Sequence, residues 1–335
     1  MDQNKRIKGA VYFPSRAYNA YQTWMDFDEA EIARDFGFAQ GARLNALRIF
    51  TSYEYWLEEP ECFWQKFELM LTLAEKHHIV VMPILFENCG REPSRENRQD
   101  RDPRTAACVQ SPGREITENP NLWEKPADYT REFMSRYADD GRLAAIETMN
   151  EPHEETGDIP FAQFITQTAY DLKKSVPLTI GCISIHHNLY FAQWLGVYQF
   201  HDNFPSSLEA FRKELAEAAS LQIRTGKPVW ISEWQRLRVS GPGWNQADIP
   251  EEDKVPQLSS LAAMVYESGI GSFFWSLMVK PAYLPDQRIN GTINGLFHED
   301  GRVYSTLDYL AVSENDHAPK EAARMPEWYA EEMKK

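Results

Sequence analysis

Two features that mark other classes of protein are missing from this chain. No window approaches the roughly 18 consecutive apolar residues of a transmembrane helix, and Met1–Lys8 is polar and charged, without the apolar core of a secretion signal. The sequence therefore argues against a membrane protein. It predicts a cytoplasmic protein if Met1 is the native start, or a secreted one if a signal peptide has been removed.

Cysteines are few, and none form a CxxC pair. The chain has 4 of them, Cys62, Cys89, Cys108 and Cys182. Without a CxxC pair, a zinc site built on cysteine is not expected. Cys62 and Cys182 fall in a predicted helix and strand and are expected to be plain buried thiols. Cys89 and Cys108 flank one long loop, and whether they pair stays open, because nothing in the sequence signals an oxidising compartment.

Basic residues are outnumbered by acidic ones. The 35 Lys and Arg residues against 50 Asp and Glu residues give a formal net charge of -15. A surface this acidic repels phosphate backbones, so nucleic acid is not expected as a partner. A neutral or cationic ligand suits it better. With 43% hydrophobic residues, the chain can bury a large core.

Eight short apolar runs recur along the chain, most of them ending in polar residues. Runs of this kind are typical of buried parallel strands whose carboxyl ends open onto loops. The predicted strands are Gly9–Phe13, Asn45–Phe50, Ile79–Phe86, Ala144–Met149, Leu178–Ile183, Val197–His201, Val229–Ser232 and Gly271–Trp275.

Helical patterns lie between these strands. They are Asp28–Leu44, Pro60–His78, Phe161–Lys174, Ser206–Arg224 and Glu251–Ser268. The alternation predicts an α/β protein with a parallel sheet, most simply a closed (β/α)8 TIM barrel. The alternative is an open doubly wound sheet, but the first strand leads into Phe13-Pro14-Ser15-Arg16 rather than a glycine-rich phosphate loop. Since no linker or internal repeat is present, we predict a single domain over residues 1–335, with 313–335 a tail packed on the barrel.

Three long loops follow the third, seventh and eighth predicted strands. They are Asn88–Lys125, Gln235–Glu252 and Met278–Tyr304. In a barrel all three lie over the same mouth, where long loops commonly wall a binding site. Because Asn88–Lys125 is densely charged, a surface excursion remains an alternative for that loop.

Two glutamates stand at the ends of the fourth and seventh strands. Glu151 follows Asn150 and precedes Pro152, which disfavours helical backbone at Glu151. Glu233 ends the run Val229–Ser232. A single glutamate at a strand end is usually a salt bridge or a helix cap, but two at one barrel mouth can act as general acid/base and nucleophile on a glycosidic bond.

Strand alternation also predicts which side chains share a face. It places Ile231 and Glu233 on one face of the seventh strand, and Trp230, Ser232 and Trp234 on the other.

With Asn150-Glu151-Pro152 after strand four and Ser232-Glu233 at strand seven, the sequence resembles the clan A glycoside hydrolases, retaining glycosidases built on a (β/α)8 barrel. The resemblance extends from about Gly9 to Tyr309 and is nearest to the cellulase and mannanase type. It implies that Glu151 is the acid/base and Glu233 the nucleophile. It also implies that Arg48 supports the nucleophile and that Trp275 floors the sugar site.

Two positions depart from the family pattern. His201 matches the strand-six histidine, but His201-Asp202-Asn203 lacks the tyrosine that often follows it. After strand three the chain has Glu87-Asn88-Cys89 where many relatives have a histidine. The substrate and the exact family stay open for this reason.

The remaining candidates are expected to bind substrate. Asn150, Glu87 and Asn88 can bind sugar hydroxyls, and Trp24 and Trp234 lie where an indole ring could contact a sugar. The full set of predicted substrate-binding residues is Arg48, Asn150, His201, Trp275, Glu87, Asn88, Trp24 and Trp234.

The implied reaction is a double displacement on a β-linked sugar, with a carbohydrate as the partner and no metal or cofactor. Glu233 must be ionised, which Arg48 would favour, and the nearby charge of Glu233 is expected to raise the pKa of Glu151. For retention the carboxyl groups should lie about 5–5.5 Å apart. Long loops favour a pocket and exo action on a β-glucoside, β-mannoside or β-galactoside, with an endo-acting β-glycanase as the alternative.

Two other functions compete with this one. A metal-dependent hydrolase on the same fold would need a His-x-His motif after strand one, where the chain has Phe13-Pro14-Ser15. A non-catalytic carbohydrate-binding barrel would generally have lost one of the two glutamates, and both are present. The sequence does not predict an oligomeric state.

Overall fold

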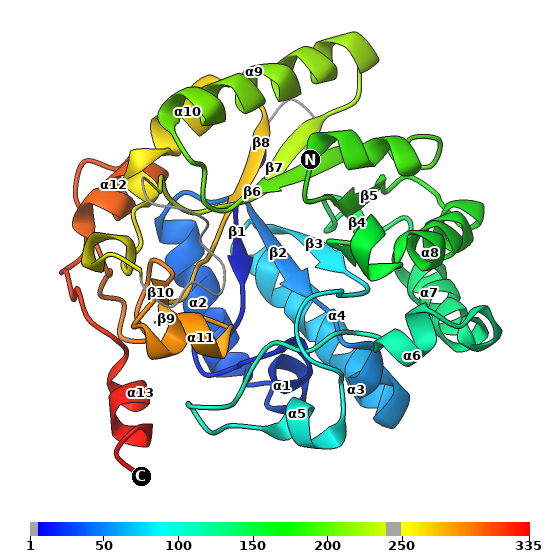
Figure 1. Ribbon diagram of the computed structural model, residues 1–335, viewed down its shortest axis with the longest axis horizontal. Helices are drawn as coiled ribbons and strands as arrows, with labels where there is room; N and C mark the ends of the chain where they lie inside the picture. The colour runs from blue at the N-terminus through cyan, green and yellow to red at the C-terminus, as the bar shows by residue number, and fades with distance from the viewer. Residues whose placement is uncertain (1–5, 239–248) are drawn as a thin grey trace.

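The computed structural model describes residues 6–238 and 249–335 and shows eight parallel strands curled into a barrel (Figure 1). The hydrogen-bonded order is β5-β4-β3-β2-β1-β8-β7-β6. The two end strands meet where the His201 N–H donates to the Cys182 carbonyl at 3.0 Å, so the ring is nearly closed. The predicted TIM barrel is confirmed. The strands are β1 Lys8–Tyr12, β2 Ala46–Phe50, β3 Val80–Ile84, β4 Ile146–Asn150, β5 Leu178–Gly181, β6 Tyr198–Asp202, β7 Val229–Trp234 and β8 Gly271–Phe274.

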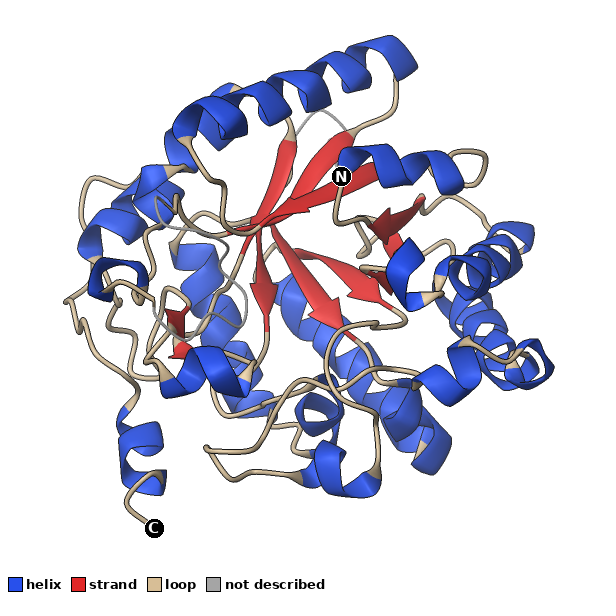
Figure 2. Ribbon diagram, viewed as in Figure 1, coloured by secondary structure: helices blue, strands red, loops and turns tan. Residues whose placement is uncertain are grey.

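Helices surround the strands on the outside (Figure 2). The α-helices are α1 Ala20–Met25, α2 Glu29–Gly41, α3 Tyr53–Glu58, α4 Pro60–Lys76, α5 Arg95–Gln99, α6 Arg114–Thr117, α7 Glu124–Tyr137, α8 Ile159–Asp171, α9 Leu208–Thr225, α10 Ala262–Glu267, α11 Pro285–Ile289, α12 Thr306–Ser313 and α13 Glu327–Glu332. The 3-10 helices are η1 Pro120–Leu122, η2 Glu154–Thr156, η3 Ile185–Tyr190, η4 Glu251–Asp253 and η5 Leu258–Ser260. None of the helices within the described ranges is long and apolar enough to cross a membrane.

Capping residues mark where two of the longer helices, α2 and α9, begin. The Asp28 side chain accepts hydrogen bonds from two N–H groups of α2, and the Ser207 hydroxyl accepts one from α9. Four of the five predicted helices are confirmed as α2, α4, α8 and α9. The prediction for Glu251–Ser268 is wrong, because that segment divides into η4, η5 and α10. Pro256 lies between the first two and has no N–H for a continuous helix.

The apolar side chains form two main layers. One cluster joins outward-facing strand residues such as Ala10 and Ile49 to helix residues such as Phe36 and Phe67. The other fills the barrel and contains Val11, Phe13, Ala46, Phe50, Val80, Met82, Ile84, Ala145, Val197, Trp230 and Phe273. The strands are therefore buried on both faces, as the continuous apolar runs predict.

The predicted faces of β7 are correct for Glu233 and Trp234, which lie on opposite faces, but wrong for Trp230 and Ile231, because a β-bulge interrupts the alternation. The register with β6 steps from Phe200↔Ile231 to His201↔Glu233, so Ser232 has no opposite residue. Because of this extra residue, Trp230 and Glu233 both point into the barrel, although they are three positions apart. Bulges of this kind re-aim side chains near functional sites.

The long segments after β3 and β8 hold short elements of their own. The first contains α5, α6 and η1. The second forms a small antiparallel hairpin, β9 Lys280–Pro281 with β10 Ile293–Asn294, and α11 lies between its strands. Of the predicted loop Gln235–Glu252, residues 239–248 lie outside the described residues, including Gly241-Pro242-Gly243-Trp244.

Near the carboxyl terminus, the Trp328 indole N–H donates to the Ser15 hydroxyl at 3.0 Å, which ties α13 to the segment after β1. The extent of the domain, over residues 1–335, stays a prediction.

Gly9 in β1 tests how closely the strands pack. A Cβ atom there would lie 2.5 Å from the Phe273 ring and 2.7 Å from the Ala46 carbonyl oxygen. We expect Gly9→Ala to lower the free energy of unfolding by about 1–3 kcal/mol in urea denaturation, since β1 and β2 must separate to admit it. The control is Gly41→Ala in α2, where a Cβ meets nothing within 4 Å. Equal stability of the two variants would contradict this packing.

Candidate active site

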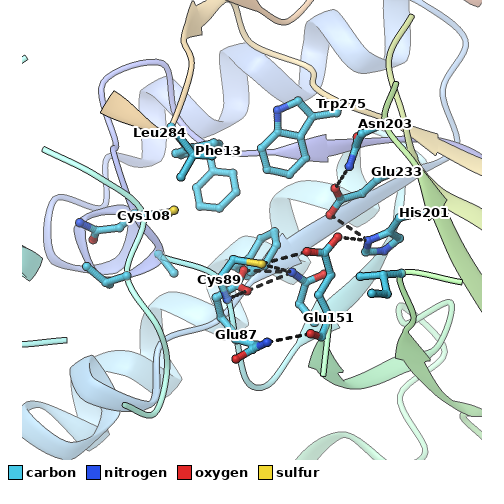
Figure 3. Close-up of a pocket in the computed structure, with 18 of the residues that line it drawn as sticks. Phe13, Glu87, Cys89, Cys108, Glu151, His201, Asn203, Glu233, Trp275 and Leu284 are labelled. Carbon is cyan, nitrogen blue, oxygen red and sulfur yellow. Dashed lines mark hydrogen bonds and ion pairs between the residues drawn. The ribbon is translucent and has the colours of Figure 1, made fainter. Parts of the chain in front are cut away.

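A pocket of about 710 Å³ opens at the carboxyl ends of the strands (Figure 3). Every strand of the barrel supplies at least one lining residue from its own end or from the residues just after it. These are Phe13, Phe50, Glu87, Asn150, Glu151, Ile183, His201, Glu233 and Trp275. The predicted convergence of strand ends therefore places the two glutamates in one pocket.

Glu151 and Glu233 face each other closely. A carboxylate oxygen of Glu151, a nitrogen of His201 and a carboxylate oxygen of Glu233 all lie within 4.8 Å of one another. Glu151 has a left-handed backbone, with φ 48°, which turns the chain sharply between Asn150 and Pro152. Its N–H donates to the Gly181 carbonyl at 2.7 Å, so β5 fixes this turn.

Arg48 is the buried cation behind Glu233. Its Nη1 donates to Glu233 Oε1 at 2.6 Å, and its Nε donates to Glu147 Oε2 at 2.7 Å. Burial lowers the pKa of Arg48, but the negative charges of Glu147 and Glu233 outweigh burial and raise it. A buried guanidinium with two carboxylates stays charged, so it can support an ionised Glu233.

Gly181 in β5 leaves room for the arginine pair. A Cβ atom at this position would lie 2.3 Å from Glu147 Oε1 and 2.9 Å from Arg48 Nη2. Glycine is therefore the residue that this close approach allows.

On the opposite side, two groups hold the carboxylate of Glu151. His201 Nδ1 lies 2.6 Å from Glu151 Oε1, and the Cys89 thiol donates to Oε2 at 2.9 Å. Burial raises the pKa of the Cys89 thiol, which keeps it protonated as a donor.

The predicted rise in the pKa of Glu151 is wrong. Burial raises this pKa, but the hydrogen bond and charge of His201 outweigh burial and lower it. Burial in turn lowers the pKa of His201, whereas the charge of Glu233 and the contact with Glu151 raise it. Both shifts favour a proton on His201 rather than on Glu151, and the two groups lie 2.6 Å apart.

Glu87 and Asn150 adjoin the two glutamates. The Asn150 amide donates to Glu87 Oε1 at 3.0 Å, and its carbonyl oxygen accepts from Arg48 Nη2 at 2.5 Å. Burial raises the pKa of Glu87 to about 8, even though the hydrogen bonds from Asn150 and from the Cys89 N–H lower it. Asn88 lines the pocket beside them and donates to the Glu151 carbonyl at 2.9 Å.

Aromatic rings form the wall opposite Glu151. Trp275 lies 6.3 Å from Phe13 and 5.2 Å from Tyr283, measured between ring centroids. Phe13 in turn stacks on Phe50 at 5.0 Å. Figure 3 shows Trp275 and Phe13 on the far side of the pocket from Glu151.

The suggested sugar contacts of Trp24 and Trp234 are not supported by their positions. Trp24 is fully buried, packs on Phe63 at 5.0 Å and donates to the Phe50 carbonyl. Trp234 is also fully buried and packs on Phe274, in the layer between strands and helices. Neither ring lines the pocket, since α1 directs the first into the core and the β7 bulge turns the second outward.

Three residues that hydrogen-bond to predicted site residues were not themselves predicted. Glu147 pairs with Arg48, Cys89 donates to Glu151, and Asn203 donates to Glu233 Oε2 at 2.8 Å. Glu147 could have been found from the sequence, because it is a charged residue inside the apolar run Ala144–Met149. Cys89 and Asn203 stand where the sequence departs from the family pattern.

Only one group of side chains in the described part of the chain has the spacing for a metal ion, namely Glu151, His201 and Glu233. Both carboxylates already contact a nitrogen partner, Glu233 that of Arg48 and Glu151 that of His201. Cys89 and Cys108 both line the pocket as free thiols.

No protein-family model matches the chain, and no curated protein matches it in sequence. Its structure matches solved glycoside hydrolases. An exo-beta-1,4-mannosidase from Opitutaceae bacterium strain TAV5 aligns with a TM-score of 0.65 at 15% identity, over 92% of this chain and 59% of that one. This chain therefore spans less than two-thirds of that mannosidase.

Two further structures give the same result. An endo-beta-1,4-mannanase from Thermotoga petrophila aligns with a TM-score of 0.60 at 13% identity, over 93% of this chain and 76% of that one. A GH5_18 protein from Bifidobacterium longum, in complex with Manb1-4GlcNAc, aligns with a TM-score of 0.64 at 12% identity, over 95% and 80%. At these identities the likeness shows the fold, which exo- and endo-acting mannan enzymes share.

Glu87 gives a pH-dependent prediction. Its folded-state pKa of about 8 lies above the usual 4.5, so the folded protein binds this proton more tightly than the unfolded chain. Glu87 therefore lowers stability progressively as pH rises from about 4.5 to 8. We expect Glu87→Gln to flatten the fall in melting temperature between pH 5 and 8. An unchanged pH dependence would show that Glu87 is ionised at neutral pH.

Proposed function

We propose that this chain is a retaining β-glycoside hydrolase in which Glu233 is the nucleophile and Glu151 the acid/base. One observation carries the proposal, namely that the nearest carboxylate oxygens of Glu151 and Glu233 lie within 4.8 Å. Retaining enzymes need carboxyl groups about 5–5.5 Å apart, whereas inverting enzymes need about 6.5–9.5 Å to admit a water.

The surroundings of the two carboxylates suit different tasks. Arg48 holds Glu233 with a charge-assisted hydrogen bond, so this carboxylate can attack the anomeric carbon as an anion. Glu151 Oε1 lies 2.6 Å from His201 Nδ1, close enough for a proton to pass between them. In the first step a Glu233 oxygen bonds to the anomeric carbon and the glycosidic C–O bond breaks. The leaving oxygen takes a proton from Glu151, which receives the proton of His201.

The second step reverses the roles. Water attacks the anomeric carbon and its proton passes to Glu151, while the bond from Glu233 to the sugar breaks. Since His201 lies 2.6 Å from Glu151 and 3.8 Å from Glu233, it gives its proton to Glu151 as Glu233 loses its charge in the first step, and it takes a proton back from Glu151 as Glu233 regains its charge in the second. His201 therefore keeps the pair in the correct protonation state for each step.

We further propose that the enzyme removes terminal sugars from β-glucosides, β-mannosides or β-galactosides. Loop residues support a pocket, because Cys108, Val109, Tyr283 and Leu284 add walls above the strand ends. The aromatic rings would contact the apolar face of the sugar. An endo-acting β-glycanase remains the alternative, and a β-mannoside is the first substrate to try, because both exo- and endo-acting mannan enzymes share the fold.

The first test is hydrolysis of aryl β-glycosides and β-linked oligosaccharides by the intact protein and by Glu233→Ala. We expect activity on at least one sugar and a loss of kcat/KM of more than about 1000-fold in the variant, because the nucleophile is gone. Full activity in the variant would exclude Glu233 as nucleophile. Sugar binding without turnover on any substrate would favour the non-catalytic carbohydrate-binding barrel.

Glu151→Ala tests the acid role separately. Poor leaving groups need a proton and good ones do not, so kcat/KM should fall far more for alkyl glycosides and oligosaccharides than for dinitrophenyl glycosides. The matched control is Glu155→Ala, an exposed carboxylate of the same loop, which should behave like the intact protein. An equal loss on all leaving groups would contradict the assignment.

A further inference from the structure

Three buried side-chain amides form a chain that ends on Glu233. The Asn203 Nδ2 donates to Glu233 Oε2 at 2.8 Å, the Gln235 Nε2 donates to Asn203 Oδ1 at 3.0 Å, and the Asn294 Nδ2 donates to Gln235 Oε1 at 3.0 Å. Figure 3 shows the first of these bonds. The three residues are only 5–6% exposed, so water competes little for their hydrogen bonds.

The direction of these three hydrogen bonds is set by Glu233, the carboxylate on which the series ends. An ionised carboxylate can only accept, so Asn203 must turn its NH₂ toward Glu233 and its carbonyl toward Gln235. Gln235 must then donate to that carbonyl and present its own carbonyl to Asn294. All three amides are therefore oriented alike, and each polarises the next toward the carboxylate.

The three amides connect separate parts of the barrel mouth. Asn203 follows β6, Gln235 follows β7, and Asn294 lies in β10 of the hairpin after β8. Between the hairpin strands, Tyr283 and Leu284 line the pocket. The segment after β8, which lines the pocket, is thus also connected to Glu233 through Gln235 and Asn203.

We propose that Asn203, Gln235 and Asn294 act together as positioning residues that hold the Glu233 carboxylate for attack. The proposal rests on the proposed function of Glu233. Arg48 holds Oε1 and Asn203 holds Oε2, so the plane of the carboxylate is fixed from both sides. No tyrosine stands two residues after His201 to do this, and Asn203 occupies that position.

Other ionisable groups also act on Glu233 and are common to every variant compared below. Arg48 and His201 lie within salt-bridge distance of it, and Glu147 shares Arg48. The remaining ionisable groups that line the pocket are Glu87, Cys89, Cys108, Glu151, His153, Asp202 and Tyr283.

The test is a double-mutant cycle with Asn203→Leu and Asn294→Leu, which remove an amide at nearly constant volume. Losing a hydrogen bond to a charged group should lower kcat/KM by about 10- to 100-fold in Asn203→Leu. Asn294→Leu, two amides away, should lower it by several-fold. If the amides act as a unit, the double variant should match Asn203→Leu within about twofold.

A pH readout separates positioning from general damage. Without the amide the ionised carboxylate loses a donor, so the acidic limb of the kcat/KM profile should move up by about one pH unit in Asn203→Leu, and less in Asn294→Leu. Gln22→Leu is the control, because Gln22 is a fully buried amide bonded to the Arg98 and Asp100 carbonyls of the loop after β3. It should lower the melting temperature and leave the acidic limb in place.

The two proposals can fail separately. Carbon NMR of protein labelled at the glutamate carboxyls follows protonation of Glu233 without turnover, with the signal assigned by its absence in Glu233→Gln. The intact protein could show no hydrolysis while Glu233 takes up its proton at a higher pH in Asn294→Leu than in the intact protein. That result would refute the proposed hydrolase activity and support the proposed role of the three amides. The role of the three amides would be overturned if the losses of kcat/KM in the two single variants multiplied in the double variant. It would also be overturned if neither the acidic limb of the kcat/KM profile nor the NMR titration of Glu233 moved in Asn294→Leu. Alanine replaces leucine wherever a leucine variant fails to fold.

Discussion

The buried charge of Arg48 is the constraint around which this barrel mouth is arranged. Its guanidinium has no exposed surface, and it bonds to Glu147, Asn150 and Glu233 from two other strands. A charge buried this deeply is tolerated only with partners in good geometry. The bulge in β7 turns Glu233 inward to meet it, and Gly181 leaves the space that the arginine and Glu147 occupy.

Around this centre, three glutamates of one pocket have different nearest neighbours. Glu87 has no cationic partner, so burial dominates and raises its pKa to about 8. Glu151 is buried too, but His201 reverses the effect and lowers its pKa. Glu233 bonds directly to Arg48. The roles proposed for these three carboxyl groups differ because each meets a different side chain.

The sequence predicted the barrel well, because its signal is local. All eight strands lie within two or three residues of their predicted ends, since an apolar run reports burial directly. The prediction of helices and strand faces failed where a single residue interrupts a regular pattern. Pro256 breaks the expected helix over Glu251–Ser268. The bulge at Ser232 puts Trp230, rather than Ile231, on the same face as Glu233.

The sequence by itself determined that Glu151 and Glu233 stand at strand ends, because a parallel barrel brings all such ends to one mouth. It could not determine their partners. Arg48 and Glu233 are 185 residues apart, and Cys89 and Glu151 are 62 apart, yet both pairs are in hydrogen-bond contact. Only the tertiary structure decided that His201 contacts Glu151, that Asn203 donates to Glu233 and that Trp24 is a core residue. Hydrogen bonds and charges act over a few ångströms, and no local pattern encodes which distant side chains come that close.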